Sequence, residues 1–565
     1  MISWMSSMSG KMILQKAFKS DAPVWLLFLS ASAWAVYPVL ASPMQRVVGW
    51  AGDNLQYMYM LGWVAKALRI GASPFIDPHL NPPAGLQLAT TDAPFLSFFL
   101  FAPLTWLTNE AFTYNLLLFL SYFLSGLFTY LWIKRLTHSR FAGLVSGLIF
   151  LLLPYRLAHG YGHLNLVSTQ FIPLFFWALD SALLPERPAL RQLVLLALST
   201  FLIGAMSQYY LVICLSCAII YALFSRPNFR YLLFQGWKFA ISALAGGLVS
   251  SLPYLRIWLD NGFKQTTIEF SRGGSAGLLN FFIPAHLHPL WGWLAWKADP
   301  SLNWVEFSIY IGLVALILAL LAISWRNSPY RSNQRIWLAT LLFAFVMALG
   351  TDLHLFAGQP LMAEHPIWLP AYFFSRLPLI GIMRVWARYA VLVSFFVALL
   401  AGIGIARLEA HPGFRPIWKF LILALIVLDF MPGKLYSIEI QPRPIDQWIA
   451  AQPGDFSLAF IPNTAGNNYL AIYASLTHEK KLPAFLRVPP PKPYDRFAHL
   501  LENFPEPSSL VALRRLGFRY IILESAYYDG QEHLSLQSVE SALSTIPRLN
   551  KVAAIDQFII YEFIR

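Results

Sequence analysis

Long apolar runs separated by short basic segments recur along the chain as far as residue 432. A helix needs about 20 consecutive apolar residues to cross the ~30 Å hydrocarbon layer of a membrane. The first run, VWLLFLSASAWAVYPVLA, follows Lys11, Lys16 and Lys19 and is longer than the roughly 7 to 15 apolar residues of a signal peptide. It predicts an uncleaved first span. Ten further spans are predicted at residues 113–133, 141–156, 164–184, 192–207, 209–225, 232–253, 305–325, 336–352, 386–406 and 416–432.

Composition supports this interpretation. The chain is 57% hydrophobic and only 12% charged, whereas about 25% of the residues of a soluble domain are charged. A soluble enzyme is excluded. The fold class predicted for residues 1–432 is an all-α polytopic membrane protein with about eleven transmembrane helices.

The basic segments predict the topology. Clusters such as Lys134/Arg135 and Arg407/Arg415 all fall on the side of the N-terminus, which places that terminus in the cytoplasm. With the N-terminus and all basic clusters on the same side, the number of crossings requires that residues 94–108 do not cross the membrane. This segment contains two prolines and is expected to lie in the interface or to re-enter. The stretches then facing outward are 43–112, 157–163, 254–304 and 353–385.

From residue 433 the pattern becomes that of a soluble domain. GDFSLAFIP, RYIILES and the terminal VAAIDQFIIYEFI predict strands, and SSLVALRRLGF and HLSLQSVESALST predict amphipathic helices. The Pro-rich RVPPPKPYDR predicts a surface loop. Residues 433–565 are therefore predicted as a small extracytoplasmic α/β domain.

Charge and motifs exclude several functions. The net charge is +13, but residues 433–565 hold equal numbers of basic and acidic residues, so the excess lies in the membrane part and does not indicate a nucleic-acid partner. The chain has no GxxxxGK[ST], no GxGxxG after a strand, no HExxH and no DxD. Any reaction must therefore draw its energy from an activated substrate or an ion gradient rather than from ATP or NAD.

The candidate catalytic residue follows the first span. In GWAGDNLQYMYMLGWVAKAL, Asp53 precedes Leu55, Tyr59, Gly62 and Lys66 at helical spacing, which places a carboxylate at the start of an interfacial helix. A partly desolvated carboxylate suits a general base that accepts a proton from a hydroxyl group. The alternative is a helix N-cap.

The order of these features resembles the GT-C superfamily of membrane glycosyltransferases. The resemblance rests on a first span, a long outer loop opening with an acidic residue, and an interfacial segment entered through TTDAPFLSFF. LPYRLAHGYGHLNLVSTQFIPLFFWAL, FFIPAHLHPLWG, SRLPLIGIMRVWARYAVLVSFFVALLAGIGIARL and LRRLGFRYIILES are similar to an uncharacterised bacterial branch. The resemblance implies a plasma (inner) membrane enzyme that moves a sugar from a polyprenyl-phosphate or polyprenyl-diphosphate donor to a saccharide, lipid or protein acceptor on the outer face. Asp53 matches the family's base or acceptor-binding group.

The second outer loop departs from the family. Several members hold a divalent metal with a second acidic motif there, whereas this chain has His159, Gly160, Gly162 and His163 in HGYGHLN. The glycines disfavour a regular helix, and two histidines alone are a weak ligand set, so no metal ligand is predicted and dependence on a divalent metal stays open. We expect His159 and His163 to donate hydrogen bonds to a phosphate or a sugar hydroxyl, or else to be ordinary interfacial residues.

Two arginines are candidates for the donor phosphate. Arg384 and Arg388 in GIMRVWARYA are spaced by one helical turn at the outer entrance of the span 386–406, and a guanidinium binds phosphate in bidentate fashion. The alternative is an interfacial anchor. Asp92 and Lys66 are weaker candidates for substrate binding.

Two other functions stay open on the sequence. A flippase or transporter of lipid-linked saccharides would show internal repeats and polar residues along a midplane path, and the chain shows neither pattern. A non-catalytic cell-envelope scaffold stays open because the acidic motif that would hold a metal is missing.

Overall fold

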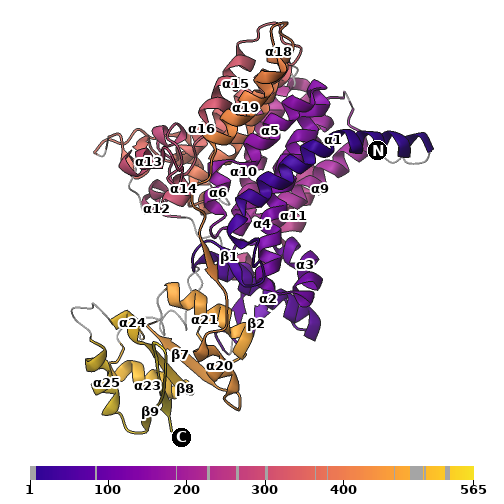
Figure 1. The fold of residues 1–565 in the computed structure, drawn as a ribbon. Helices are drawn as coiled ribbons and strands as arrows, with labels where there is room; N and C mark the ends of the chain where they lie inside the picture. Colours follow the sequence, from indigo (N-terminus) through magenta and orange to yellow (C-terminus); the bar gives the residue numbers. More distant parts are fainter. Residues whose placement is uncertain are drawn as a thin grey trace. The chain divides into compact units, whose positions relative to one another are not determined.

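A computed structural model describes residues 8–82, 85–185, 187–225, 229–261, 266–298, 303–362, 364–377, 380–462, 465–483, 501, 504–528 and 535–564. They form two compact units (Figure 1). The first unit comprises Met1–Leu40 and Leu116–Leu435, and the second Ala41–Asn115 and Tyr436–Arg565. The predicted surface loop RVPPPKPYDR lies outside the described residues. The division of the chain after residue 432 stays a prediction, and the structure adds that the first outer loop groups with the C-terminal segment.

The first unit is helical. Its longer helices, in chain order, are α1 (Met8–Ala35), α4 (Glu110–Thr137), α5 (Arg140–Leu151), α8 (Ile172–Leu183), α9 (Leu190–Met206), α10 (Gln208–Ser225), α11 (Phe229–Asn261), α15 (Leu313–Ile323), α16 (Arg331–Ala348), α18 (Ala390–Glu409) and α19 (Pro416–Asp429). Each predicted span overlaps one of them. By length and composition, four helices of the described chain, α4, α10, α11 and α18 (as Trp386–Glu409), could cross a membrane. The count of about eleven spans therefore stays a prediction.

Two predicted spans are each divided into two helices. The run 141–156 divides into α5 and α6 (Pro154–His159), and the run 164–184 into α7 (Leu164–Val167) and α8. A proline disfavours helical geometry in the preceding residue but fits the first turn of a new helix, which is where Pro154 and Pro173 lie.

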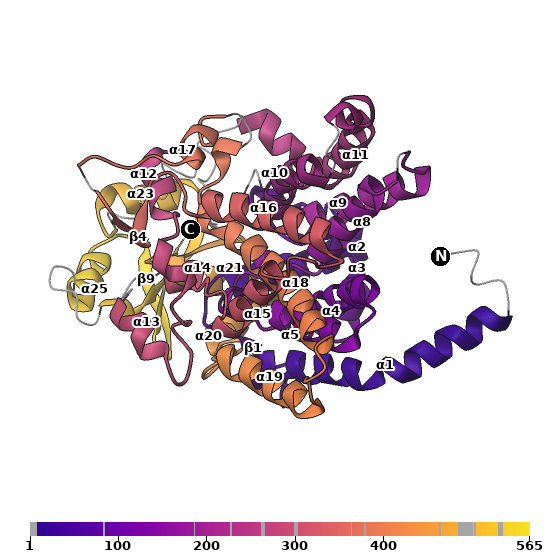
Figure 2. The ribbon, with the colours of Figure 1, turned by 90° about the horizontal axis from the view of Figure 1, so that it is seen from above.

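Helix α18 forms the centre of the first unit. Its side chains are buried from Ala390 to Ile405, and it packs against α5, α15 and α16, as Figure 2 shows from above. The contact with α15 is close because a Cβ on Gly404 would lie 2.0 Å from the carbonyl oxygen of Leu318. Helix α11, by contrast, exposes most of its apolar side chains.

The second unit joins two distant parts of the chain. Strand β1 (Arg46–Val48) pairs antiparallel with β6 (Ser437–Glu439), and α2 (Asp53–Ile70) packs against α21 (Ala465–His478). Helix α3 (Phe95–Leu107) packs on α2, where Trp106 donates a 2.7 Å hydrogen bond to the carbonyl oxygen of Ala65. Helix α3 has 13 residues and is about 20 Å long, and the expectation that residues 94–108 lie in the interface or re-enter stays a prediction.

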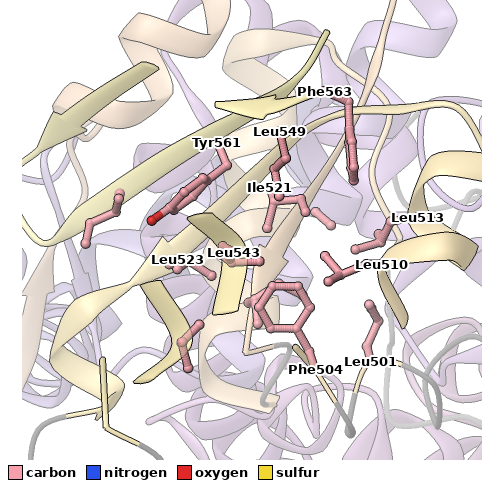
Figure 3. Packing of buried hydrophobic residues seen from close by; sticks show 14 of the residues in the cluster. Leu501, Phe504, Leu510, Leu513, Ile521, Leu523, Leu543, Leu549, Tyr561 and Phe563 are labelled. Carbon is pink, nitrogen blue, oxygen red and sulfur yellow. The ribbon is translucent and has the colours of Figure 1, made fainter. Parts of the chain in front are cut away.

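A four-stranded mixed sheet forms the C-terminal part of this unit. Its order is β7-β8-β10-β9, and only β7 and β8 are parallel. One face carries a core of aliphatic and aromatic side chains, including Ile521, Leu523 and Phe563, that packs against two helices (Figure 3). The elements are α20 (Pro444–Ala451), β7 (Ser457–Ile461), α23 (Pro507–Arg515), β8 (Phe518–Glu524), α24 (Ser525–Tyr528), α25 (Leu536–Ser544), β9 (Leu549–Ile555) and β10 (Phe558–Phe563).

This confirms the predicted α/β pattern, with one correction. VAAIDQFIIYEFI is not a single strand but parts of β9 and β10, which form an antiparallel hairpin. The chain reverses at Asp556, which has a positive φ of 50°, a conformation that aspartate tolerates in tight turns.

Candidate active site

A buried ion pair joins two segments of the first unit that are distant in sequence. Glu306 lies on the short helix α14 (Trp304–Phe307), and Arg388 lies on the 3-10 turn η6 (Trp386–Tyr389) that leads into α18. Arg388 donates from Nε to Oε2 of Glu306 at 3.1 Å and from Nη2 to Oε1 at 2.6 Å. Both residues are buried. The guanidinium also lies 4.3 Å from the ring centre of Tyr209.

Two histidines extend this pair. His159, at the end of α6, is fully buried, and its Nε2 lies 3.7 Å from Oε2 of Glu306. Its Nδ1 lies 2.9 Å from Nδ1 of His163, so one ring donates a hydrogen bond to the other. Burial lowers the pKa of His159 well below its usual range, although the Glu306 carboxylate acts in the opposite direction, and the imidazole is therefore neutral.

The histidines and Glu306 could hold a metal ion. One ligand atom from each of His159, His163 and Glu306 lies within 4.8 Å of the others. Nε2 of His159 is buried without a hydrogen-bond partner, which is unusual for a polar atom. Two imidazoles and one carboxylate match the protein ligands of many catalytic zinc sites. The sequence predicted no metal ligand because it showed only the two histidines.

The two predicted arginines have different surroundings. Arg388 uses Nε and Nη2 on Glu306, and its Nη1 has no hydrogen-bond partner among the described residues. Arg384 is exposed, and its guanidinium lies 5.6 Å from the ring centre of Phe270 on α12 (Ile268–Gly273). The expected helical-turn spacing of the two arginines is wrong, because the helix starts at Trp386 and Arg384 precedes it.

Asp53 is the first residue of α2, as predicted, and Gly52 takes the N-cap position. The carboxylate therefore lies at the positive end of the helix dipole, which stabilises its charged form. Asp53 belongs to the second unit and the arginines to the first, so their approach stays a prediction.

The weaker candidates lie in the second unit. Lys66 forms a 2.8 Å ion pair with Glu479, at the end of α21. The backbone carbonyl of Asp92 accepts a 3.1 Å hydrogen bond from Tyr57 on α2. Substrate binding by either side chain stays a prediction.

Sequence reasoning missed Glu306 and a second buried acid, Asp352. Arg272 of α12 binds Asp352 through Nε and Nη2, with the Nη2–Oδ2 distance 3.1 Å, and His354 Nε2 lies 3.1 Å from the same oxygen. Neither acid has a motif around it, so no sequence signal distinguished them from the other carboxylates of the predicted outer loops. Their arginine partners come from segments distant in sequence, 80 residues away for Asp352 and 82 for Glu306.

Comparisons with known proteins support the fold. A model of the family described as Domain of unknown function (DUF6311) matches residues 26–431. No curated protein matches the chain.

Among solved structures, the arabinofuranosyltransferase AftD from Mycobacteria (mutant R1389S) is similar, with a TM-score of 0.60 and 14% identity over 97% of this chain and 41% of that one. The chain thus spans less than half the length of that transferase. ArnT from Cupriavidus metallidurans, bound to undecaprenyl phosphate, matches with a TM-score of 0.51 and 12% identity over 99% of both chains. The predicted GT-C fold is therefore confirmed.

Proposed function

We propose that this chain, which belongs to the DUF6311 family and has the GT-C fold, is a membrane glycosyltransferase. Its donor is a sugar linked to polyprenyl phosphate or polyprenyl diphosphate. The observation that carries the proposal is the match over 99% of both chains to a structure holding undecaprenyl phosphate. The acceptor, a saccharide, lipid or protein, is taken on the outer face of the membrane.

Each residue has a role in this reaction. Asp53 accepts the proton of the acceptor hydroxyl, whose oxygen forms the new bond to the anomeric carbon. The bond from that carbon to the donor phosphate oxygen breaks, and the polyprenyl (di)phosphate leaves with the electron pair. Arg384 and the Nη1 group of Arg388 bind the leaving phosphate, while His159 and His163 hydrogen-bond to phosphate or sugar oxygens.

Glu306 keeps Arg388 in place. Its two oxygens fix the guanidinium plane, so the remaining edge is presented in one orientation. Where a divalent cation is bound, His159, His163 and Glu306 would hold it in place of the hydrogen bonds to substrate, and the cation would supply positive charge that stabilises phosphate oxygens.

Sugar transfer in membranes tests the proposal. Membranes containing wild-type protein or Asp53→Asn are given radiolabelled polyprenyl-phosphate sugars with their endogenous acceptors. We expect transfer by the wild type and at least a 100-fold loss in Asp53→Asn at equal insertion. The control is Asp455→Asn, which changes an exposed carboxylate paired only with Lys481 and should keep full activity. Equal transfer by Asp53→Asn would remove Asp53 from catalysis.

Donor binding can be measured without an acceptor. Undecaprenyl phosphate should raise the unfolding temperature of the purified wild-type protein, because a ligand that binds only the folded state stabilises it. Arg384→Gln should reduce this rise, since it removes the exposed cation. No rise in the wild type would contradict a polyprenyl-phosphate donor.

A further inference from the structure

Helix α13 (Gly292–Ala298) exposes large apolar side chains, whereas a helix in water is expected to bury them. Its buried face consists of Gly292 and Ala295, and its exposed face of Trp293, Leu294 and Trp296, which are 64%, 40% and 42% exposed. A surface helix of a soluble protein places polar side chains on that face. The preceding Leu290 and Trp291 are exposed as well, at 52% and 38%. We refer to Leu290, Trp291, Trp293, Leu294 and Trp296 as the α13 surface.

The chain around this surface contains almost no charge. Residues 275–298 have no acidic residue, and their titratable side chains are His286, His288 and Lys297. Both histidines are buried beneath the helix, where His286 contacts Trp296 and His288 stacks on Trp291. Lys297 lies at the end of the helix, where its long side chain can extend to the headgroups while the tryptophans stay deeper.

Helices before and after α13 in the chain also expose apolar side chains at the ends that precede and follow this segment. Helix α11, a candidate span, exposes apolar side chains up to its end, with Leu252 60% and Leu259 76% exposed. The next long helix, α15, starts with Leu313, which is 59% exposed. Figures 1 and 2 show α13 beside the bundle that contains α15 and α18.

We propose that the α13 surface inserts into the headgroup layer of the outer membrane leaflet and anchors this outer loop to the lipid. Tryptophan is the residue type enriched at that depth, because its ring is apolar and its N–H is polar. A bilayer also accounts for the apolar residues that water would not favour. The inference depends on the membrane location of the chain and not on the proposed reaction.

The anchor has a direct connection to the candidate active site. Trp296 contacts Trp304 at a ring-centre distance of 6.3 Å, and Trp304 opens α14, the helix that carries Glu306. On its other side Trp304 contacts Tyr161, in the turn between His159 and His163. Lipid contact at α13 therefore fixes the depth at which α14 lies.

Depth-dependent fluorescence quenching tests the anchor. In a background with Cys214→Ala and Cys217→Ala, the protein carries Trp293→Cys labelled with an environment-sensitive fluorophore and is reconstituted into phosphatidylcholine vesicles. Lipids with a nitroxide at carbon 5 or carbon 12 of the acyl chain report shallow and deep positions, and aqueous iodide reports exposure to water. We expect strong quenching by the shallow nitroxide and at least threefold less iodide quenching than at an aqueous site.

Two variants calibrate the measurement. Leu248→Cys on α11, where the leucine is 68% exposed in a candidate span, should be quenched best by the deep nitroxide. Gln537→Cys on the exposed polar face of α25 should be quenched by iodide alone. The proposal is overturned if the probe at 293 behaves like the probe at 537. It is also overturned if the probe is shielded from iodide but not quenched by either lipid, since a protein partner then covers the surface.

Discussion

The Arg388–Glu306 pair is the residue-scale feature with the clearest energetic consequence. Replacing Glu306 with Gln leaves the buried guanidinium without its counter-charge, which costs about 3 to 5 kcal/mol in comparable buried pairs. We expect a large fall in the unfolding midpoint of the purified protein, and partial recovery in Glu306→Gln/Arg388→Met.

The matched control is Glu540→Gln. Its 2.7 Å pair with Lys551 is partly exposed at both ends, so solvent screens it and the expected loss is below about 1 kcal/mol. Equal shifts for the two single variants would show that the Arg388–Glu306 pair is not buried in the folded protein.

His478 makes the stability of the second unit depend on pH. Burial lowers its pKa to about 4, and Arg443 acts in the same direction while Asp446 opposes it. In the unfolded chain the imidazole titrates near pH 6.5, so between pH 6.5 and 4 only the unfolded state binds the proton. Stability must fall as the pH falls through this window, by about 3 kcal/mol at most.

The variant His478→Asn separates this effect from other acid titrations. Asparagine keeps an acceptor for the backbone N–H of Lys480, which donates to Nδ1 of His478, but it does not titrate. Denaturant unfolding of the variant should depend less on pH between 6.5 and 4 and match the wild-type slope above pH 7. Identical slopes at low pH would place His478 in contact with water.

At the scale of elements, apolar periodicity predicted where helices occur but not where they end. Each predicted span contains a helix, but the helix that begins the run 141–156 ends at Leu151, because Pro154 starts a new helix. Local sequence patterns were also insufficient to predict the partners within the candidate active site. Arg388 was identified from its spacing near a span, but its partner Glu306 is 82 residues away, and no local pattern could connect the two.

Close helix packing in the first unit depends on glycine, and α11 offers a direct comparison. A Cβ on Gly246 would lie 2.1 Å from the carbonyl oxygen of Ala197 on α9, whereas a Cβ on Gly236 would meet nothing within 4 Å. Gly246→Ala should therefore destabilise the protein by about 1 to 3 kcal/mol through overpacking. Gly236→Ala should be neutral or slightly stabilising, because alanine favours the helix. Similar unfolding midpoints for both variants would contradict the close α9–α11 contact.

At the scale of the whole molecule, the sequence located the change of pattern near residue 433 but not the grouping of the units. That grouping depends on β1 pairing with β6, in the register Arg46 opposite Glu439, and on α2 packing against α21. Such contacts form between segments that show no complementary signal in a single sequence. The first outer loop, with Asp53, thus belongs to the same unit as the C-terminal sheet.

The proposed reaction requires residues from both units to act on the same donor sugar. The base contacts the acceptor oxygen at about 3 Å, that oxygen approaches the anomeric carbon, and the arginine contacts the phosphate on the other side, so the side chains of Asp53 and Arg384 have to lie within roughly 10 Å of each other. In the background lacking Cys214 and Cys217, Asp53→Cys/Arg384→Cys should be joined by a bifunctional thiol reagent of about that length. The linked peptides are detected by mass spectrometry after proteolysis.

The control pair is Gln537→Cys/Arg384→Cys, because residue 537 lies on α25, outside every proposed site. We expect little linkage in this pair at equal labelling by a monofunctional reagent. If both cysteines of the first pair react singly but are never linked, Asp53 cannot serve as the base for a phosphate held at Arg384. The glycosyltransferase proposal would then need another carboxylate, and the buried acids Glu306 and Asp352 of the first unit would be the ones to test.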